Sequence, residues 1–246
     1  EKLQAAGIIP FAHGGQAWQD ATVFEAVAMG IGGNNYYKNC YVDLKESCLR
    51  SETTVKVFDQ MRKLQGFTDE GSPGRDWNVA TGMVIEGKAG FQIMGDWAKG
   101  EFTAAGKVPG VDYYCAATPS NNGYLYNVDS FIFYKSSDPD KQAGQKLLAK
   151  LMMGKNFQKV FNLYKGSIPA RLDVSMDEFD KCAKTSNADI KTAGASGGLV
   201  PSFAHGMAQG NTMKAALQDI ITEHFNSDMS SVDAANALAD SVLANM

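Results

Sequence analysis

Apolar residues recur every three or four positions in several segments, and this spacing predicts amphipathic helices that face a core. The first such helix covers Ala21–Met29, and the cluster Gly30–Gly33 is predicted to end it. Asp138 followed by Pro139 is a favourable helix start, because an acidic cap precedes a proline of fixed φ. Ser175 and Glu178 have the spacing of a capping box, which predicts another helix start. Further helices are predicted over Glu52–Leu64, Trp77–Glu86, the segment from Gly154 to Lys165, Met213–Phe225 and Ser231–Leu243.

Short segments with alternating or uninterrupted apolar residues lie between these helices and predict strands. They are Ala89–Met94, Tyr113–Ala117 and Asn127–Tyr134, with an extended stretch Leu199–Phe203 after the loop Gly194–Gly198. Helices that alternate with strands indicate an α/β fold rather than a helix bundle or a β-sandwich.

Length, composition and charge restrict the class of protein and the kind of partner. The 246 residues are 44% hydrophobic and 20% charged, which is typical of a globular protein of one large domain, or of one domain and part of another. The net charge of −4 and the presence of only four arginines argue against nucleic acid as a partner. No apolar run approaches the ~20 residues that a membrane-spanning helix needs, so we do not expect a membrane-embedded protein. Because the chain starts at Glu1 without an apolar leader, we expect a processed or shortened chain.

The four cysteines do not form a metal-binding pattern. No two of them make a C-x-x-C pair and the chain has three histidines, so we expect no metal site. They are either buried free thiols or disulfides formed in an oxidising compartment, and composition does not decide between these alternatives.

The sequence offers little support for a common catalytic or nucleotide-binding motif. The chain has no Walker loop and no H-E-x-x-H motif, and Gly30–Gly33 lacks the spacing of a dinucleotide fingerprint. Gly194–Gly198 formally matches a nucleophile elbow, but it follows a polar helical stretch instead of a buried strand. The sequence therefore does not favour a serine hydrolase.

Aromatic and polar residues gather where loops are predicted. Trp97 and Asp96 follow a strand, where α/β proteins bind ligands. His205 lies in another loop, and a glycine-rich loop contains a further aromatic and polar group, His13, Gln16 and Trp18. Flat rings combined with amide, carboxylate and ammonium groups are the residue types that bind sugars, because rings stack on the pyranose while polar groups satisfy its hydroxyls.

Five stretches carry a resemblance to a known family. They are Gly7–Asp20 (GIIPFAHGGQAWQD), Gly87–Trp97 (GKAGFQIMGDW), Asn127–Phe131 (NVDSF), Phe161–Arg171 (FNLYKGSIPAR) and Leu199–Met207 (LVPSFAHGM). In these stretches the chain resembles the periplasmic glucose-binding proteins of bacterial ABC importers, which are distant relatives of maltose-binding protein. The resemblance runs from Glu1 to Met246.

The resemblance implies a fold of two α/β lobes that hold one sugar in the cleft between them. Carried over by position, it implies that Trp97 and His205 are the flat walls that stack on the sugar. It further implies that Asn127, Asp129 and Lys165 bind the sugar hydroxyls, which suits the donors and acceptors of these side chains. Asp129 and Lys165 could instead form an ordinary ion pair, and His205 could be a structural histidine. His13, Gln16, Trp18, Asp96 and Arg171 are ligand or hinge residues on this interpretation.

The family pattern also implies a missing part. Roughly the first third of a family member has no counterpart here, so we expect residues 1–123 and 167–246 to form the C-terminal lobe. Residues 124–166 would then be a crossing strand and helices of the otherwise missing N-terminal lobe. Their apolar faces would lack a sheet, and large exposed apolar surfaces indicate a missing partner. We therefore expect association with the missing N-terminal segment or with a second copy.

Function follows from the same resemblance. We expect a periplasmic protein, not an enzyme, that binds glucose or an epimer without a cofactor and delivers it to ABC permease subunits. A chemoreceptor is a further expected partner. The periplasm favours a Cys115–Cys182 disulfide and, less strongly, a Cys40–Cys48 disulfide. The alternatives are a carbohydrate-active hydrolase with paired carboxylates, which would need a second acid ~5–10 Å from the first, and a non-binding assembly or receptor-interaction module.

Overall fold

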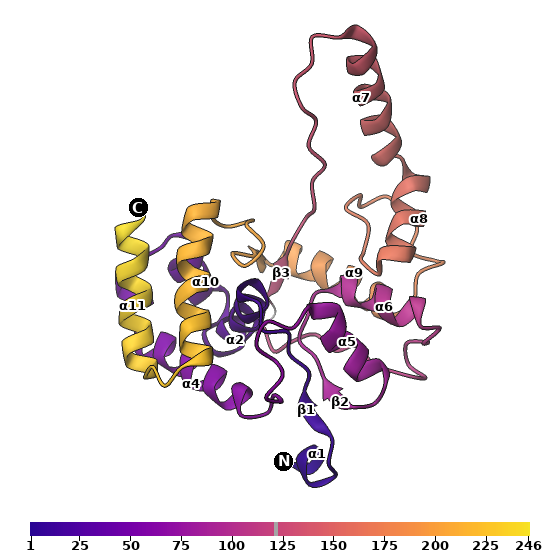
Figure 1. Ribbon diagram of the computed structural model, residues 1–246. Coiled ribbons are helices and arrows are strands. Elements are labelled where there is room, and N and C mark those ends of the chain that lie inside the picture. The colour runs from indigo at the N-terminus through magenta and orange to yellow at the C-terminus, as the bar shows by residue number, and fades with distance from the viewer. Residues whose placement is uncertain (121–122) are drawn as a thin grey trace. The chain divides into compact units, whose positions relative to one another are not determined.

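The computed structural model describes residues 1–120 and 123–246, and they divide into two compact units. Unit 1 comprises Glu1–Gly95, Ala116–Asn127 and Asp189–Met246. Unit 2 comprises Asp96–Cys115 and Val128–Ala188. Figure 1 labels most of the elements, and α9 (Lys181–Ala195) begins in unit 2 and ends in unit 1.

Helices dominate both units. Unit 1 contains α1 (Lys2–Ala5), β1 (Ile9–Phe11), α2 (Ala17–Tyr37), η1 (Lys38–Val42), α3 (Glu46–Leu49), α4 (Glu52–Gln65), α5 (Trp77–Ile85), β2 (Ala89–Phe91), β3 (Tyr124–Tyr126), β4 (Leu199–Pro201), α10 (Asn211–Asn226) and α11 (Ser231–Ala244). Unit 2 contains η2 (Asp96–Ala98), α6 (Lys99–Ala104), α7 (Pro139–Met152) and α8 (Lys155–Lys165), and α9 (Lys181–Ala195) begins in it. The expected α/β alternation is present, although the strands are short.

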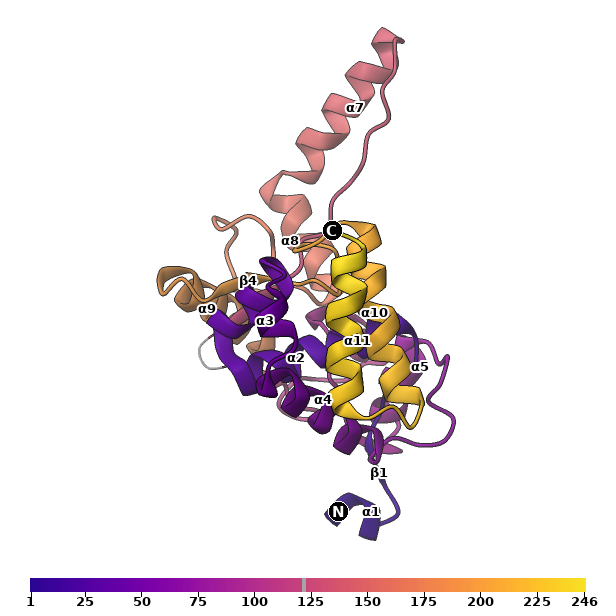
Figure 2. The same ribbon diagram turned by 90° about the vertical axis from the view of Figure 1, so that its left-hand side faces the viewer.

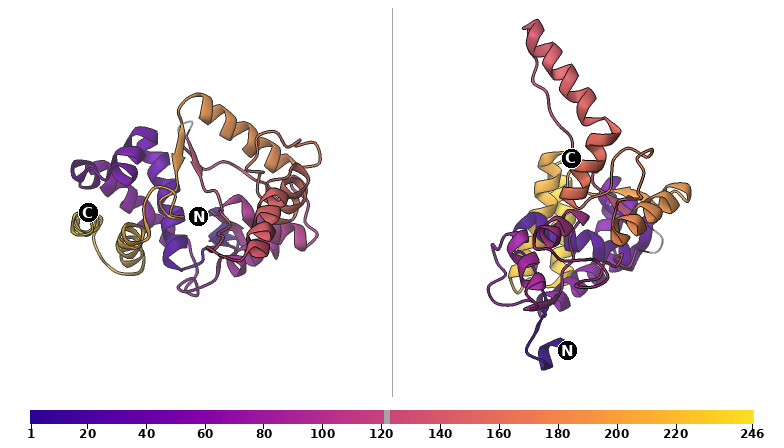
Figure 3. Two further views of the ribbon diagram at one scale, coloured as in Figure 1. Left: turned by 90° about the horizontal axis from the view of Figure 1, so that it is seen from above. Right: turned by 90° about the vertical axis from the view of Figure 1, so that its right-hand side faces the viewer.

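The core of unit 1 lies among α2, α4, α10 and α11, whose apolar stripes face one another. In Figures 1 and 2, α10 and α11 lie side by side, and Figure 3 shows the same pair from above. Phe24 lies at the centre, with its ring 5.0 Å from that of Phe58 and 6.3 Å from that of Phe203. Phe203 belongs to the loop after β4, so the core fixes the position of that loop.

Two parallel strand pairs complete unit 1. The pair of β1 and β2 matches Ile9 with Ala89, and the pair of β3 and β4 matches Tyr126 with Pro201. Because paired parallel strands point the same way, the residues that follow β3 and β4 emerge at one edge. Ser202 N–H donates to the carbonyl of Tyr126 at 3.0 Å and so extends this pairing.

Unit 2 has a smaller core of Val174, Phe179 and Ala183. The ring of Phe102 in α6 stacks on that of Tyr113 at 4.1 Å. Lys99 donates to Asp180 at 2.8 Å, so the largely buried ammonium has a carboxylate partner. A disulfide between Cys115 and Cys182 joins the segment after α6 to α9.

Several helix boundaries follow the predicted signals. Asp138 caps α7 by accepting from the backbone N–H groups of Asp140 and Lys141 at 2.9 and 3.3 Å. Helix α8 ends at Gly166, whose φ of +90° is the left-handed conformation that glycine adopts readily. The predicted helices α4, α5, α10 and α11 are all present.

The glycine cluster interrupts α2, as the prediction expects. Gly33 has a non-helical φ of +72°, so two helical segments meet there at a kink, and the second runs on to Tyr37. A Cβ on Gly32 would lie 2.1 Å from the Tyr36 ring, and a Cβ on Gly30 would lie 2.9 Å from the Pro119 carbonyl. Gly30 and Gly32 therefore allow close packing, and Gly33 breaks the helix.

Two predicted strands and one predicted cap are wrong. Neither Tyr113–Ala117 nor Asn127–Tyr134 is a strand; the strand in this region is β3, just before Asn127. A strand needs a neighbour for its backbone groups, and apart from an isolated bridge between Pro109 and Tyr113 no described residue pairs along either segment. No helix starts after Ser175, whose hydroxyl instead donates to the Asp177 carboxylate at 2.7 Å; the next helix starts at Lys181.

One buried histidine predicts how the stability of unit 1 depends on pH. His224 in α10 is fully buried against Phe58, with ring centroids 4.8 Å apart, and neither ring nitrogen has a hydrogen-bond partner among the described residues. Burial and the nearby Arg62 lower the pKa of His224 from 6.5 to about 4, whereas Asp59 opposes this shift. The unfolded chain therefore takes up a proton between pH 6.5 and 4 that the folded chain does not bind.

We expect the unfolding free energy of unit 1 to fall by about 3 kcal/mol from pH 7 to pH 4 through this group alone. Urea unfolding of the parent and of His224→Phe across this range measures the effect, because phenylalanine keeps a ring beside Phe58 but does not titrate. The parent should lose about 3 kcal/mol more than the variant. Parallel pH dependences would contradict the burial argument.

Candidate functional site

Trp97 lies in unit 2 within the short helix η2, half-buried, directly after Asp96. The Asp96 carboxylate accepts from the backbone N–H of Ile168 at 3.1 Å. Burial raises the pKa of Asp96, and hydrogen bonds from Ser167 and Ile168 oppose this rise. Asp96 thus ties the Trp97 turn to the segment after α8, which is a positioning role.

The end of α8 lies close to the start of α6. A Cβ on Gly166 would lie 2.6 Å from the backbone nitrogen of Gly100, and a Cβ on Gly100 would lie 2.9 Å from the Lys165 carbonyl. Only glycine fits at either position, so both are needed to keep Lys165 near the turn of Trp97.

Lys165 makes an ion pair with Asp129. The Asp129 side chain is 61% exposed and that of Lys165 is 28% exposed, so solvent screens their attraction. The Lys165 ammonium also lies 6.0 Å from the centroid of the Phe161 ring, within reach of a cation–π interaction. An exposed pair of this kind contributes little to stability, and its polar atoms can exchange partners at low cost.

Within unit 1, Asn127 and the loop with His205 lie at the edge where β3 and β4 end. Asn127 directly follows β3, and Ser202 directly follows β4. His205 Nδ1 lies 2.8 Å from Ser202 Oγ and 3.6 Å from Oε1 of the buried Glu25. The strand pairing therefore brings Asn127 to the edge from which the loop with His205 starts.

Trp18 contacts His205 edge to face, with centroids 6.0 Å apart and an interplanar angle of 70°. The indole N–H of Trp18 donates to Gln16 Oε1 at 2.9 Å, and the Gln16 amide donates to Asp76 Oδ1 at 2.5 Å. The sequence placed Trp18 and Gln16 in an aromatic and polar loop but did not predict this contact with His205. The sequence carries no signal for this contact, because Trp18 and His205 lie 187 positions apart.

The described contacts of His13 are structural. Its ring is 2% exposed, lies 5.0 Å from the ring of Phe225, and places Nε2 2.6 Å from Asp20 Oδ1. Asp20 in turn accepts from the Thr222 hydroxyl at 2.8 Å. This chain of contacts joins the loop before α2 to α10.

Arg171 in unit 2 also makes structural contacts. Its guanidinium donates to Asp173 at 2.8 and 2.7 Å and to the Met153 carbonyl at 3.1 Å. These bonds hold the chain after α8 to the turn between α7 and α8. The predicted site residues thus fall into two groups, Asn127, His205, His13, Gln16 and Trp18 in unit 1, and Trp97, Asp96, Asp129, Lys165 and Arg171 in unit 2.

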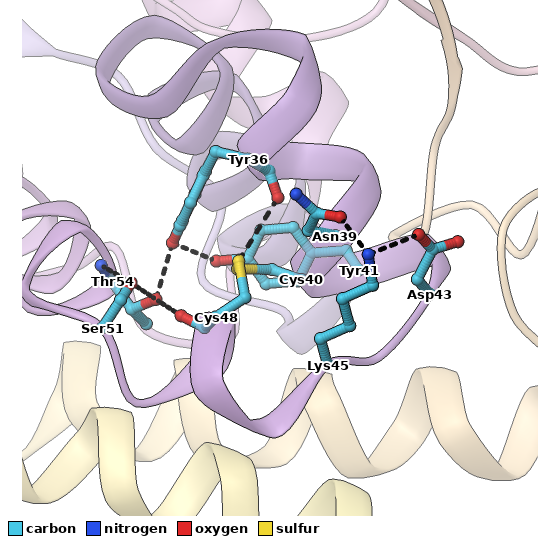
Figure 4. Close-up of a disulfide and its surroundings, with 9 residues drawn as sticks. All are labelled: Tyr36, Asn39, Cys40, Tyr41, Asp43, Lys45, Cys48, Ser51 and Thr54. Carbon is cyan, nitrogen blue, oxygen red and sulfur yellow. Dashed lines mark hydrogen bonds and ion pairs between the residues drawn. A yellow bond between two sulfur atoms is a disulfide. The ribbon is translucent and has the colours of Figure 1, made fainter.

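Both predicted disulfides are present. The Cys40–Cys48 bridge joins η1 to α3, with Cα atoms 5.2 Å apart, and Figure 4 shows it beside Tyr36 and Tyr41. The Tyr36 hydroxyl lies 2.9 Å from that of Tyr41 and 2.8 Å from that of Thr54 (Figure 4). The Cα atoms of the second bridge, Cys115–Cys182, lie 5.8 Å apart. Cys115 lies outside any strand, contrary to the expectation of a strand-to-helix bridge.

The first bridge supports the loop that contains His205. The carbonyls of Tyr41 and Val42, in the η1 segment that the bridge holds, each accept from the Gln209 side chain at 2.9 Å. Among residues 1–120 and 123–246, no group of three His, Cys, Asp or Glu side chains is arranged to hold a metal ion.

Comparison with known proteins identifies the family. The family model described as bacterial extracellular solute-binding protein matches residues 2–192. The chain belongs to this family. A "probable sugar-binding periplasmic protein" of Brucella suis biovar 1 (strain 1330) is 46% identical over 98% of the chain, and one of Rhizobium meliloti (strain 1021) is 44% identical over 98%. The chain spans 57% and 58% of the lengths of these two relatives.

Solved structures support the fold of this extracellular solute-binding protein. The bacterial solute receptor AcbH superposes with a TM-score of 0.69 at 16% identity, covering 99% of this chain and 62% of the receptor. A chitin oligosaccharide binding protein gives a TM-score of 0.70 at 16% identity, covering 97% of this chain and 60% of that protein. The predicted α/β fold of the periplasmic-binding-protein type is confirmed.

Two further predictions follow from membership of this family. The family and its curated relatives are described as solute-binding and sugar-binding proteins, which agrees with the expectation of a binding protein and not with the hydrolase alternative. The relatives are called periplasmic, which confirms the predicted localisation. Within the part of the chain that the structure describes, every helix is too short or too polar to cross a bilayer.

Proposed function

We propose that this chain binds a monosaccharide, with glucose as the first choice, and delivers it to the permease of an ABC importer. The observation that carries the proposal is the 46% identity, over 98% of the chain, to a probable sugar-binding periplasmic protein. The side chains at the candidate site agree with it, because they combine aromatic rings with an amide, a carboxylate and an ammonium group.

In this proposal Trp97 and His205 stack on the C–H faces of the sugar ring. Asp129 accepts from hydroxyls, Lys165 donates to hydroxyls, and Asn127 does both. The Asp129–Lys165 pair suits this role, because a solvent-exposed ion pair gives up little stability when each partner turns to a hydroxyl. Hydrogen bonds to these charged groups are worth more than neutral ones, about 1.5–3 kcal/mol each.

Delivery would depend on closure of two lobes around the sugar, which excludes water and strengthens the polar contacts. The closed form would be the one that permease subunits, and a chemoreceptor, recognise. In this scheme residues 1–123 and 167–246 belong to the C-terminal lobe, and residues 124–166 belong with the N-terminal lobe.

Exposed apolar side chains support this lobe assignment. In α7, Leu147 is 70% exposed and Leu151 is 59% exposed, and in α8 Tyr164 is 79% exposed. Ile132, in the segment before α7, is 80% exposed. Such surfaces are rare on monomers, and we propose that the missing N-terminal segment or a second copy covers them.

Calorimetry with glucose, galactose, mannose and maltose tests the proposal. It is done on this chain and on a chain extended to the length of the curated relatives. Galactose belongs in the panel because the AcbH structure is described as having an exclusive preference for β-D-galactopyranose. We expect the extended chain to bind a hexose more tightly than this chain. If neither chain binds any of the four sugars, the proposal of a glucose-like ligand fails, and the assembly or receptor-interaction alternative gains support.

A further inference from the structure

A buried hydrogen-bond network holds the loop between β4 and His205. Glu25 of α2 is 3% exposed, and its Oε1 lies 2.7 Å from Ser202 Oγ. Its other oxygen, Oε2, lies 3.0 Å from the Tyr37 hydroxyl and 3.3 Å from the backbone nitrogen of Ala204. All of these residues belong to unit 1. The carboxylate thus collects three donors, two of them from the loop after β4.

Tyr37 supports this network as a hydrogen-bond donor. Burial, and then the charge of Glu25, raise the pKa of Tyr37 well above its usual value, so the phenol keeps its proton. Its oxygen also lies 3.0 Å from the Pro201 carbonyl and accepts from the Phe203 N–H at 3.0 Å. Because the single phenol proton goes to Glu25, Tyr37 and Glu25 hold the backbone that follows Ser202, through the N–H groups of Phe203 and Ala204.

Counting protons at Ser202 identifies the tautomer of His205. A serine hydroxyl has one proton to donate and two lone pairs to accept with. A carboxylate only accepts, so the Ser202 proton goes to Glu25. The backbone N–H of His205 donates to Ser202 Oγ at 3.1 Å, and His205 Nδ1 lies 2.8 Å from the same oxygen. Because Ser202 has no second proton to donate, the proton between these two atoms must be on Nδ1.

We propose that Ser202, supported by Glu25, is a positioning residue that fixes the His205 imidazole as its Nδ1–H tautomer. In the neutral ring, Nε2 then has a lone pair and no proton. Nε2 is buried in this structure, so sugar binding would have to uncover it, and a hydroxyl that then reaches it must donate to it. His205 would then act as a hydrogen-bond acceptor as well as a flat wall. Only this consequence for sugar binding rests on the proposed function; the tautomer does not.

Nitrogen-15 NMR of histidine-labelled protein reads the tautomer directly, because protonated and unprotonated ring nitrogens differ widely in chemical shift. The full chain has three histidines, so the spectrum is simple, and the signal that disappears in His205→Gln belongs to His205. At pH 8 and without sugar, we expect a protonated Nδ1 and an unprotonated Nε2. A protonated Nε2 with an unprotonated Nδ1 would overturn the proposal, and this result needs no Ser202 variant.

Variants of Ser202 then test its role. In Ser202→Ala the Nδ1 proton loses its acceptor, because Glu25 Oε1 at 3.6 Å is too far for a hydrogen bond. We expect the Nδ1–H preference to be lost in Ser202→Ala and restored in Ser202→Thr, which keeps the hydroxyl. Ser196→Ala is the matched control, because the Ser196 hydroxyl donates to the Ala193 carbonyl at 3.2 Å, and its removal should leave the tautomer unchanged. Retention of Nδ1–H in Ser202→Ala would overturn the role of Ser202.

The second part of the test measures the glucose affinity of the same variants by calorimetry. We expect Ser202→Ala to weaken binding about tenfold and Ser202→Thr to restore most of it, because one buried hydrogen bond to the ligand loses its orientation. If the spectra show the Nδ1–H tautomer but glucose does not bind the parent, the proposed function fails while the tautomer assignment stands. If glucose binds and the tautomer is Nε2–H, only the present inference fails.

Discussion

Replacing Trp97 by alanine should weaken glucose binding at least about thirtyfold, because truncating a buried aromatic contact costs about 2 kcal/mol or more. The indole is half-buried in the structure and is held by the turn that Asp96 ties down, so little ordering remains to be done when a sugar stacks on it. Titration calorimetry on the chain extended to the length of its relatives measures the change.

Trp77→Ala is the matched control for this prediction. Trp77 is also half-buried and lies at the start of a short helix, α5, but neither the resemblance nor the geometry gives it a part in binding. We expect Trp77→Ala to change glucose affinity by no more than about twofold, which corresponds to a change in binding free energy below about 0.5 kcal/mol. Equal losses in the two variants would mean that Trp97 acts only through general stability.

His205 allows the ring and its nitrogens to be separated. His205→Ala should lose as much affinity as Trp97→Ala, whereas His205→Phe keeps a flat ring and should retain part of it. Full affinity in His205→Ala would show that the imidazole is not a wall of the site.

Removing the Cys115–Cys182 bridge should produce the largest loss of stability. This bridge closes 67 residues of chain, and the Cys40–Cys48 bridge closes 8. Because a disulfide restricts the unfolded chain more as its loop lengthens, Cys115→Ser with Cys182→Ser should cost about 4 kcal/mol, whereas Cys40→Ser with Cys48→Ser should cost about 2.5 kcal/mol. The two double variants serve as controls for each other.

Unfolding of unit 2 can be followed separately. The chain has three tryptophans, and of these only Trp97 belongs to unit 2, so a background of Trp18→Phe and Trp77→Phe leaves a single fluorescent reporter there. The urea concentration at the midpoint of this fluorescence transition should fall in the variant that lacks Cys115 and Cys182. It should stay nearly unchanged in the variant that lacks Cys40 and Cys48. A larger fall of the midpoint in the variant without Cys40 and Cys48 would contradict the claim that the Cys115–Cys182 bridge stabilises unit 2.

Local signals in the sequence predicted the helices well. The Asp138 cap and the left-handed Gly166 define the outer limits of α7 and α8, because both act on neighbouring backbone groups. Strands were predicted less well, since a strand depends on a distant neighbour. The apolar run Asn127–Tyr134 finds none among the described residues, whereas Tyr124–Tyr126 pairs with Leu199–Pro201 far along the chain.

The site was predicted through residue types and family resemblance, not through its supports. Nothing in the sequence links Glu25 to Ser202, which lie 177 residues apart, because Glu25 belongs to none of the recognised stretches. The chain is helical again after the break at Gly33 and so reaches Tyr37, and the sequence did not predict this second helical segment. The network behind His205 therefore became visible only once the fold had brought these elements together.

The central claim is that Trp97 and His205 form the walls of a glucose site. A crystal structure of the chain extended to the length of its relatives, with glucose bound, tests it most directly. The account predicts a pyranose stacked on the Trp97 indole and in contact with the His205 ring, with Asn127, Asp129 and Lys165 within hydrogen-bond distance of its hydroxyls. A sugar bound elsewhere, touching neither ring, would contradict it.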